Sequence, residues 1–202
     1  MRGQFSDERS FGFGWIADEP AFLQRASYAL VDAGGVWLVD PVDVDGLDER
    51  VRAAGEPAGV LQLIDRHGRD GTTLARRYGV PIHQALAGGA PEAPFEFFRS
   101  VDLPLWREAA LWWPERRTLV VGDALGTASY FLAPGERLGV HPLLRMLPPR
   151  SLARFEPEHV LCGHGAGVHG VDVATALQEA LRSSRRRTPK WLVGLIRNAV
   201  GR

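Results

Sequence analysis

The sequence predicts an α/β fold built on a partly parallel sheet, and three observations support this prediction. Short runs rich in Val and Leu end at glycine or at a polar residue, as buried strands do. Between residues 28 and 83 such runs alternate with helix-like segments, which implies right-handed crossovers between parallel strands. A second group of strand-like runs follows between residues 95 and 121. With 202 residues and 45% hydrophobic content, we expect one domain, residues 1–202.

The first expected elements are a hairpin, a helix, a strand, a second helix and a short strand, over residues 28–40, 47–54, 59–64, 71–78 and 80–83. The hairpin is predicted because Gly34 tolerates the positive φ of a tight connection. The helices are predicted from apolar residues at helical spacing, and Gly55 and Gly79 are suited to end them.

The later elements are expected at residues 95–99, 109–113, 118–121 and 159–162 for strands, and at 143–147, 151–155, 172–181 and 188–200 for helices. Pro148 and Pro149 should break the apolar helix before residue 151. Thr188 and Pro189 have the chemistry of an N-cap and a first helical turn, so the last helix, about 188–200, is predicted to begin there. It is basic and amphipathic.

Three polar residues each follow a strand-like run. They are His67, Asp123 and His164. Because open α/β sheets place their sites at the carboxyl ends of strands, these side chains are expected to meet. Histidine and aspartate are common metal ligands, so a metal centre is the first hypothesis for the function.

The segment Asp65-Arg66-His67-Gly68-Arg69-Asp70, with Gly122-Asp123 and Gly163-His164-Gly165, resembles the metallo-β-lactamase superfamily. The resemblance covers roughly residues 25 to 180. It implies a somewhat shortened four-layer αββα sandwich, in which a strand ends in a His-any-His-any-Asp-His signature and two later strands end in Gly-Asp and Gly-His-Gly.

The signature is altered in this chain. Asp65 stands at its first histidine position, His67 keeps the second, Arg69 stands at the aspartate position and Asp70 at the last histidine position. Arg69 places a permanent cation where the family supplies an anion to a second metal, so we expect that metal to be lost. The family's remaining histidine should fall near residues 104–108, where Glu108 is the only substitute ligand.

The resemblance implies a metal site made from Asp65, His67, Asp70, Asp123 and His164. It would hold one divalent ion, zinc, manganese or iron, or no metal at all. The candidate catalytic residues are Asp123 and Asp70, with Asp123 holding the metal and orienting a water. The implied reaction is hydrolysis of an ester, thioester or related small substrate. The alternative is a family member without catalysis that serves as a binding or scaffold module.

Two other motifs are weaker. The glycines between residues 165 and 170 match a dinucleotide-binding pattern, but no acidic residue follows Glu179 to bind a ribose. The single cysteine, Cys162, excludes an internal disulfide and is expected to be a small buried core residue rather than a nucleophile.

The formal net charge is zero, but residues 182–202 carry 7 basic and no acidic residues, against 17 basic and 24 acidic before them. We expect this basic end to dock against the acidic body or against a second subunit in a homodimer. Contact with a membrane surface or nucleic acid is the alternative, although no nucleic-acid partner is expected. No apolar run approaches the length of a membrane span, and the amino terminus lacks a secretion signal, so a cytoplasmic location is expected.

Overall fold

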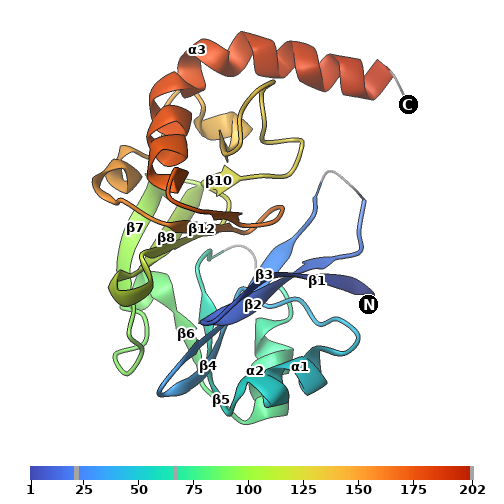
Figure 1. The fold of residues 1–202 in the computed structure, drawn as a ribbon, viewed down its shortest axis with the longest axis vertical. Coiled ribbons are helices and arrows are strands. Elements are labelled where there is room, and N and C mark those ends of the chain that lie inside the picture. Colours follow the sequence, from blue (N-terminus) through green and yellow to red (C-terminus); the bar gives the residue numbers. More distant parts are fainter. Residues whose placement is uncertain (21–22, 66–67, 201–202) are drawn as a thin grey trace.

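The computed structural model describes residues 1–20, 23–65 and 68–200, with side chains as far as residue 195, and consists of two sheets packed face to face (Figure 1). The first sheet has the order β1-β2-β3-β4-β5-β6, with strands Gly3–Arg9, Gly12–Ala17, Ala26–Asp32, Gly35–Val39, Pro57–Gln62 and Ile82–Gln84. The second has the order β13-β12-β9-β8-β7, with strands Val168–His169, His159–Cys162, Thr118–Val121, Trp106–Trp113 and Glu96–Leu103. Both sheets are mixed, since β4, β5 and β6 pair in parallel, as do β9 and β12.

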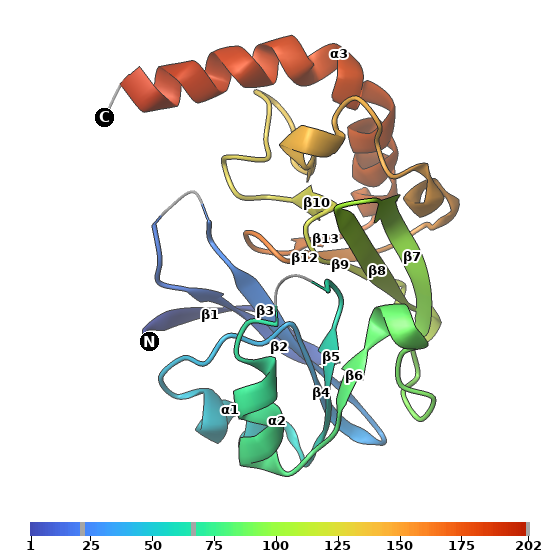
Figure 2. The same cartoon turned by 180° about the vertical axis from the view of Figure 1, so that it is seen from behind.

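Helices cover the outer faces of both sheets (Figures 1 and 2). Helices α1 (Leu47–Ala54) and α2 (Gly71–Tyr78) pack on the first sheet, and α3 (Val173–Val200) packs on the second. The predicted αββα arrangement is therefore confirmed. Within the described part of the chain, no helix combines the length and apolar composition needed to cross a membrane.

Side chains alternate between separate cores along the central strands. In β9, Leu119 and Val121 enter the core beneath α3, whereas Val120 enters the core between the sheets. In β4, Trp37 likewise enters the core between the sheets, whereas Leu38 enters the core beneath α1 and α2. Strands buried on both faces read as continuous hydrophobic runs, which is why these segments could be recognised from sequence.

Backbone hydrogen bonds join the two sheets at one end of the sandwich. The Ala26 amide donates to the Gly163 carbonyl at 2.9 Å, and the Ala109 amide donates to the Leu63 carbonyl at 2.9 Å. Bridges between Arg25 and His164 and between Ile64 and Glu108 lie beside these bonds. This end, where β4, β5, β9 and β12 finish, carries Asp123 and His164, which follow β9 and β12.

The amino-terminal strands β1 and β2 were not expected. Strand β1 is Gly-Gln-Phe-Ser-Asp-Glu-Arg, which lacks a hydrophobic run because it is a half-buried edge strand that, in the described part of the chain, pairs with β2 alone. Two short strands, β10 (Leu125–Gly126) and β11 (Gly139–Val140), also pair outside the main sheets.

The helices expected at residues 143–147 and 151–155 are wrong as α-helices. Short 3₁₀ turns stand there instead, η3 (Pro142–Leu144) and η4 (Arg150–Arg154), because the prolines between them leave too few residues for an α-helical ladder. Further 3₁₀ turns are η1 (Ala85–Ala87) and η2 (Pro114–Arg116).

The expected start of a separate helix at residue 188 is also wrong. Residues 188–200 are helical, but they continue from residue 173 as α3, with Pro189 inside the helix. The Thr188 hydroxyl donates back to the Ser184 carbonyl at 3.0 Å and does not serve as an N-cap. Proline lacks the amide hydrogen that would bond one turn back, and the ribbon bends in the preceding turn (Figure 1).

Tyr28→Phe should destabilise the protein by about 1–3 kcal/mol, because it leaves buried polar groups of β12 without a partner. The Tyr28 hydroxyl donates to the Cys162 carbonyl at 2.9 Å and accepts from the Cys162 amide at 3.2 Å, across the two sheets. Urea unfolding would measure the loss. The control is Tyr78→Phe, which should cost less because its partner, Asp48, is partly solvated. Equal losses would contradict this role for Tyr28.

Candidate metal centre

The structure brings together two of the predicted site residues, Asp123 and His164. Asp123 follows β9 and His164 follows β12, and these parallel neighbours end side by side. The His164 Nε2 atom lies 3.1 Å from the Asp123 Oδ1 atom, and both side chains are largely buried. The prediction that these two strand ends converge is therefore supported by the geometry.

The hydrogen bond of the other ring nitrogen of His164 determines which nitrogen carries the hydrogen. Its Nδ1 atom bonds the Leu23 carbonyl, which can only accept, so Nδ1 carries a hydrogen. The singly protonated ring then directs a bare Nε2 towards a carboxylate oxygen. Two lone pairs face each other unless a proton or a cation lies between the two atoms, and such a proton can belong to the His164 ring or to the Asp123 carboxyl. Phe131 stacks on the ring at 5.4 Å between centroids and fixes its plane.

Glu108 is not available as the substitute ligand considered from sequence. Its carboxylate is fully buried and accepts the amide hydrogens of Gly122, Asp123 and Ala124 at 3.1, 2.9 and 3.2 Å. The Ser100 hydroxyl donates to it as well, at 3.2 Å. Burial and the neighbouring Asp123 raise the pKa of Glu108 to about 8, although these donors act in the opposite direction. Glu108 therefore fixes the turn that carries Asp123 instead of binding an ion itself.

Arg69 occupies the end of the sandwich with its guanidinium group. It donates to the carbonyls of Asp40 and Gly163 at 2.9 and 3.0 Å and to the carbonyl of Ala26. The Ser27 hydroxyl lies at 3.4 Å. These acceptors come from β3, from the end of β4 and from the end of β12, so one side chain bonds both sheets. The sequence showed that Arg69 stands at the aspartate position of the signature, but it did not predict these hydrogen bonds.

Asp40 is a site residue that sequence reasoning missed. It directly follows β4, is buried, and accepts the Leu63 amide at 3.0 Å. Burial raises the pKa of Asp40 to about 6, while the Arg69 charge opposes the shift. Asp40 and Arg69 both have φ near 40°, a region where non-glycine residues are uncommon and reflect local constraint. The sequence signal was a hydrophobic strand that ends in aspartate, as it does at Asp123.

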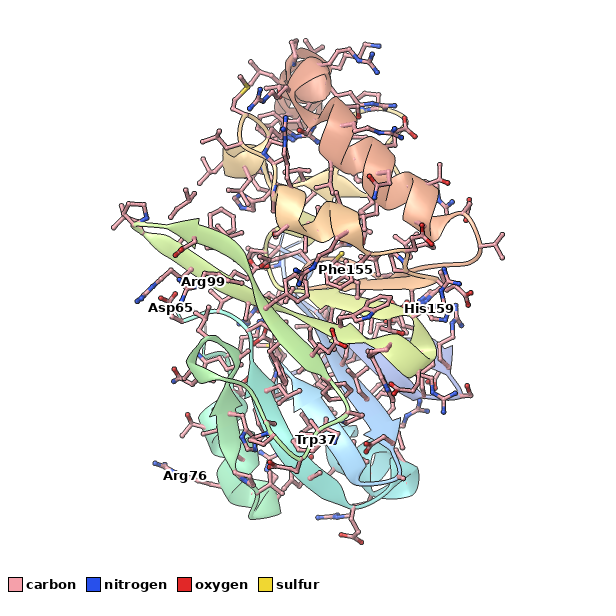
Figure 3. All side chains as sticks on the ribbon, turned by 90° about the vertical axis from the view of Figure 1, so that its left-hand side faces the viewer. Trp37, Asp65, Arg76, Arg99, Phe155 and His159 are labelled. Atoms are coloured by element: carbon pink, nitrogen blue, oxygen red, sulfur yellow. The ribbon has the colours of Figure 1, made fainter. Side chains whose placement is uncertain are left out.

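Of the other predicted ligands, Asp65 and Asp70 make their contacts with groups other than Asp123 and His164. Asp65 is exposed at the surface (Figure 3) and lies 3.5 Å from Arg107. Asp70 begins α2 and accepts the Asp43 amide at 2.8 Å. His67 lies outside the described residues. Among the described residues, no three His, Cys, Asp or Glu side chains form a group that could hold a metal ion. The placement of Asp65 and Asp70 thus gives the predicted five-residue set no support.

A second polar cluster supports the loop that follows His164. Asp7 accepts from the Gly167 amide at 3.0 and 3.1 Å and from the Nε2 atom of His169 at 2.8 Å. The Nδ1 atoms of His169 and His159 lie 2.9 Å apart. Burial raises the pKa of Asp7, but the hydrogen bonds from His169 and Gly167 outweigh it, so the net shift is downward. The cluster ties β1 to the loop that carries His164.

Comparison with solved structures identifies the fold. The metallo-β-lactamase DIM-1 matches with a TM-score of 0.64 and 12% identity, covering 94% of this chain and 98% of that chain. The metallo-β-lactamase FIM-1 from Pseudomonas aeruginosa, in its mono-zinc form, matches with a TM-score of 0.61 and 10% identity over 94% and 96%. Rubredoxin oxygen:oxidoreductase from Desulfovibrio gigas matches at 0.58 and 14% over 90% and 61%. No family model and no curated protein matches the sequence. The chain has the metallo-β-lactamase fold.

Asp7→Asn should destabilise the protein by about 1.5–3 kcal/mol at pH 7, because it removes a buried charged acceptor. The folded pKa of Asp7 lies below the ordinary 3.8, so its stabilising effect is complete above that value and is lost as pH falls through the folded pKa. The difference between wild type and variant should therefore shrink only below about pH 4. Urea unfolding at several pH values would measure it. The exposed Asp18→Asn is the control, and a difference that instead shrinks towards high pH would contradict the assignment.

Arg69→Met should lower the free energy of unfolding by about 2–4 kcal/mol, because carbonyls from both sheets lose their donor. Arg76→Met is the matched control, since Arg76 is exposed on α2 (Figure 3). The control should stay within about 0.5 kcal/mol of wild type. Similar values for both variants would show that Arg69 does not join the sheets.

Proposed function

We propose that this chain is a metal-dependent hydrolase with a single divalent ion, held by Asp123, His164 and His67. The observation that carries the proposal is the orientation of His164, whose Nδ1 hydrogen is held by the Leu23 carbonyl while its Nε2 atom faces Asp123. Histidine ligands of metals commonly donate their other ring hydrogen to a carbonyl in this way.

The spacing of the His164 and Asp123 donor atoms fits one shared ion, as it also fits a hydrogen bond between them. Two atoms that share a zinc ion at bond lengths of about 2.0–2.2 Å lie roughly 3.3 Å apart in tetrahedral geometry. The separation of 3.1 Å between His164 and Asp123 is close to this value. Arg69 donates to the carbonyl of Gly163, the residue before His164, and its positive charge there opposes a second cation. The third ligand of a single site would be His67, the one histidine that the altered signature retains.

A divalent ion at this position would lower the pKa of a bound water to about 7 and polarise the scissile bond. The chain's own residues position the ligands. Glu108 fixes the Asp123 turn, and Phe131 and Leu23 fix the His164 ring. Arg69 donates to main-chain carbonyls, which supports a structural role for it rather than substrate binding.

The proposed substrate is an ester, a thioester or a related small molecule. Beside the loop that follows His164 lies a groove of about 460 Å³, lined in part by Gln24, Thr127 and His169. Asp123 and His164 do not line this groove, so it supports space for a small substrate next to the proposed site rather than contact with the ion. The fold accommodates one zinc ion in FIM-1 and also serves an oxidoreductase. Two imidazoles and one carboxylate would bind zinc, manganese or iron, so the identity of the metal is part of the test.

The second candidate is a binding or scaffold module without catalysis. It is favoured by the bonds of Arg69, which join the two sheets without a metal, and by the ion pair between Asp65 and Arg107. This candidate predicts no bound metal and no change of stability on chelation.

Protein purified without chelator should contain about one metal ion per chain, and chelation should lower its thermal stability, because the ion binds only the folded state. Elemental analysis would measure the content. His164→Ala and His67→Ala should remove most of the metal, whereas His83→Ala should not, since His83 lies on the edge strand β6 and faces Glu92. Metal-free wild-type protein, or equal losses in all three variants, would reject the proposed site.

A further inference from the structure

Although the formal net charge is zero, the basic and acidic residues are concentrated in different parts of the chain. Residues 137–155 and 180–202 contain eleven basic residues and no acidic one, which leaves 13 basic and 24 acidic residues in the rest of the chain. In the structure, residues 137–155 and 180–200 lie together at the end of the molecule opposite α1 and α2 (Figures 1 and 2). We call the described side chains of these segments the basic cap.

Three arginines of the basic cap surround one pocket. Arg150, Arg182 and Arg185 line a cavity of about 240 Å³ together with apolar atoms of Pro148 and Leu181. In the described part of the chain, none of the three forms an ion pair. Arg182 and Arg185 donate to the carbonyls of Gln178 and Met146 through one nitrogen each, which leaves guanidinium hydrogens available to an anion.

Other cations of the basic cap are already neutralised within the chain. Arg145 pairs with the buried Glu136, Arg137 with Asp172, and Arg187 with Glu179. Docking against the acidic body therefore accounts for these residues but not for the three arginines around the pocket.

Large aliphatic side chains are exposed beside this pocket. Leu143, Met146 and Leu147 are 79%, 59% and 65% exposed, in the turn whose carbonyl Arg185 binds. On α3, Leu192 and Val193 are each 49% exposed. Leu192 follows Arg185 by seven residues, close to two full helical turns, and Val193 is its neighbour. Half of the exposed large hydrophobic side chains of the described residues thus belong to the basic cap.

We propose that the basic cap binds the surface of a membrane that contains anionic lipids. The arginine pocket would take a lipid phosphate group, and the aliphatic side chains would enter the boundary between headgroups and acyl chains. Unpaired arginines beside exposed aliphatic residues are the combination that interfacial binding requires. A nucleic acid would use the charge but gives no reason for exposed leucines, since its phosphates and bases contact polar and aromatic groups. The metal centre plays no part in this contact.

Cosedimentation with vesicles tests the proposal. Full-length wild-type protein should bind vesicles of phosphatidylcholine mixed with phosphatidylglycerol, should not bind phosphatidylcholine alone, and should be released by high salt. Each basic residue at an anionic surface contributes about fivefold, so Arg150→Gln with Arg182→Gln and Arg185→Gln should weaken binding on the order of 100-fold. Leu143→Ser with Leu147→Ser should weaken it by at least about tenfold.

Matched controls come from the opposite end and from other exposed sites. Arg2→Gln with Arg52→Gln and Arg76→Gln removes the same charge from exposed arginines outside the basic cap, and should leave binding within about twofold, since the effect of a charge decays within a Debye length. Leu105→Ser, at an 85% exposed leucine of the β7–β8 turn, is the apolar control. The salt and lipid dependence of the wild type needs no variant and tests the proposal even if a variant folds poorly.

Three results would overturn the proposal. The first is failure of the wild type to bind the anionic vesicles, and the second is equal weakening by the control arginines. The third is a different partner at the basic cap. A nucleic-acid partner would be shown by oligonucleotide binding that survives the leucine substitutions, in a protein that does not bind vesicles. A second copy of the chain would be shown by a dimer in light scattering that the cap arginine substitutions convert to monomer, again without vesicle binding.

Discussion

The bonds from the Arg69 guanidinium to main-chain carbonyls of both sheets are the interaction on which the candidate site depends. The guanidinium group presents donors in a fixed plane, so it can bond the ends of β4 and β12 together, which a lysine ammonium could not reproduce. This fixed charge also limits the chemistry. A divalent ion placed beside this guanidinium would be repelled and would leave the carbonyls without a donor, which is why the site we propose holds a single ion.

The acidic side chains at this end have different roles because their surroundings differ. Asp40 and Glu108 are both buried, and burial raises the pKa of each, to about 6 and about 8. Backbone amides bind them, so they fix strand ends and turns instead of binding ions. Asp123 lies above Glu108 and extends towards His164. The Glu108 carboxylate thus holds the backbone turn from which the Asp123 carboxylate extends.

The sequence predicted strand ends well and side-chain directions poorly. The convergence of Asp123 and His164 followed from hydrophobic runs that end in glycine, because parallel neighbours finish at the same edge. The same logic failed for Asp65 and Asp70, since the strand end does not tell which partner a carboxylate meets, and Arg107 and the Asp43 amide were not foreseeable. Edge strand β1 was missed because a strand held by one neighbour and solvent needs no hydrophobic run.

The segment from Gly163 to Gly167 connects stability with the candidate chemistry. Arg69 bonds Gly163, Leu23 bonds the His164 ring, Gln24 accepts the Gly165 amide, and Asp7 accepts the Gly167 amide. His164 is therefore held between fixed neighbours on both sides, and its Nε2 atom is directed at Asp123 by bonds that involve no ion. In the proposed metal site, ligands positioned in advance would lose little freedom on binding, so folding would supply much of the order that the ion requires.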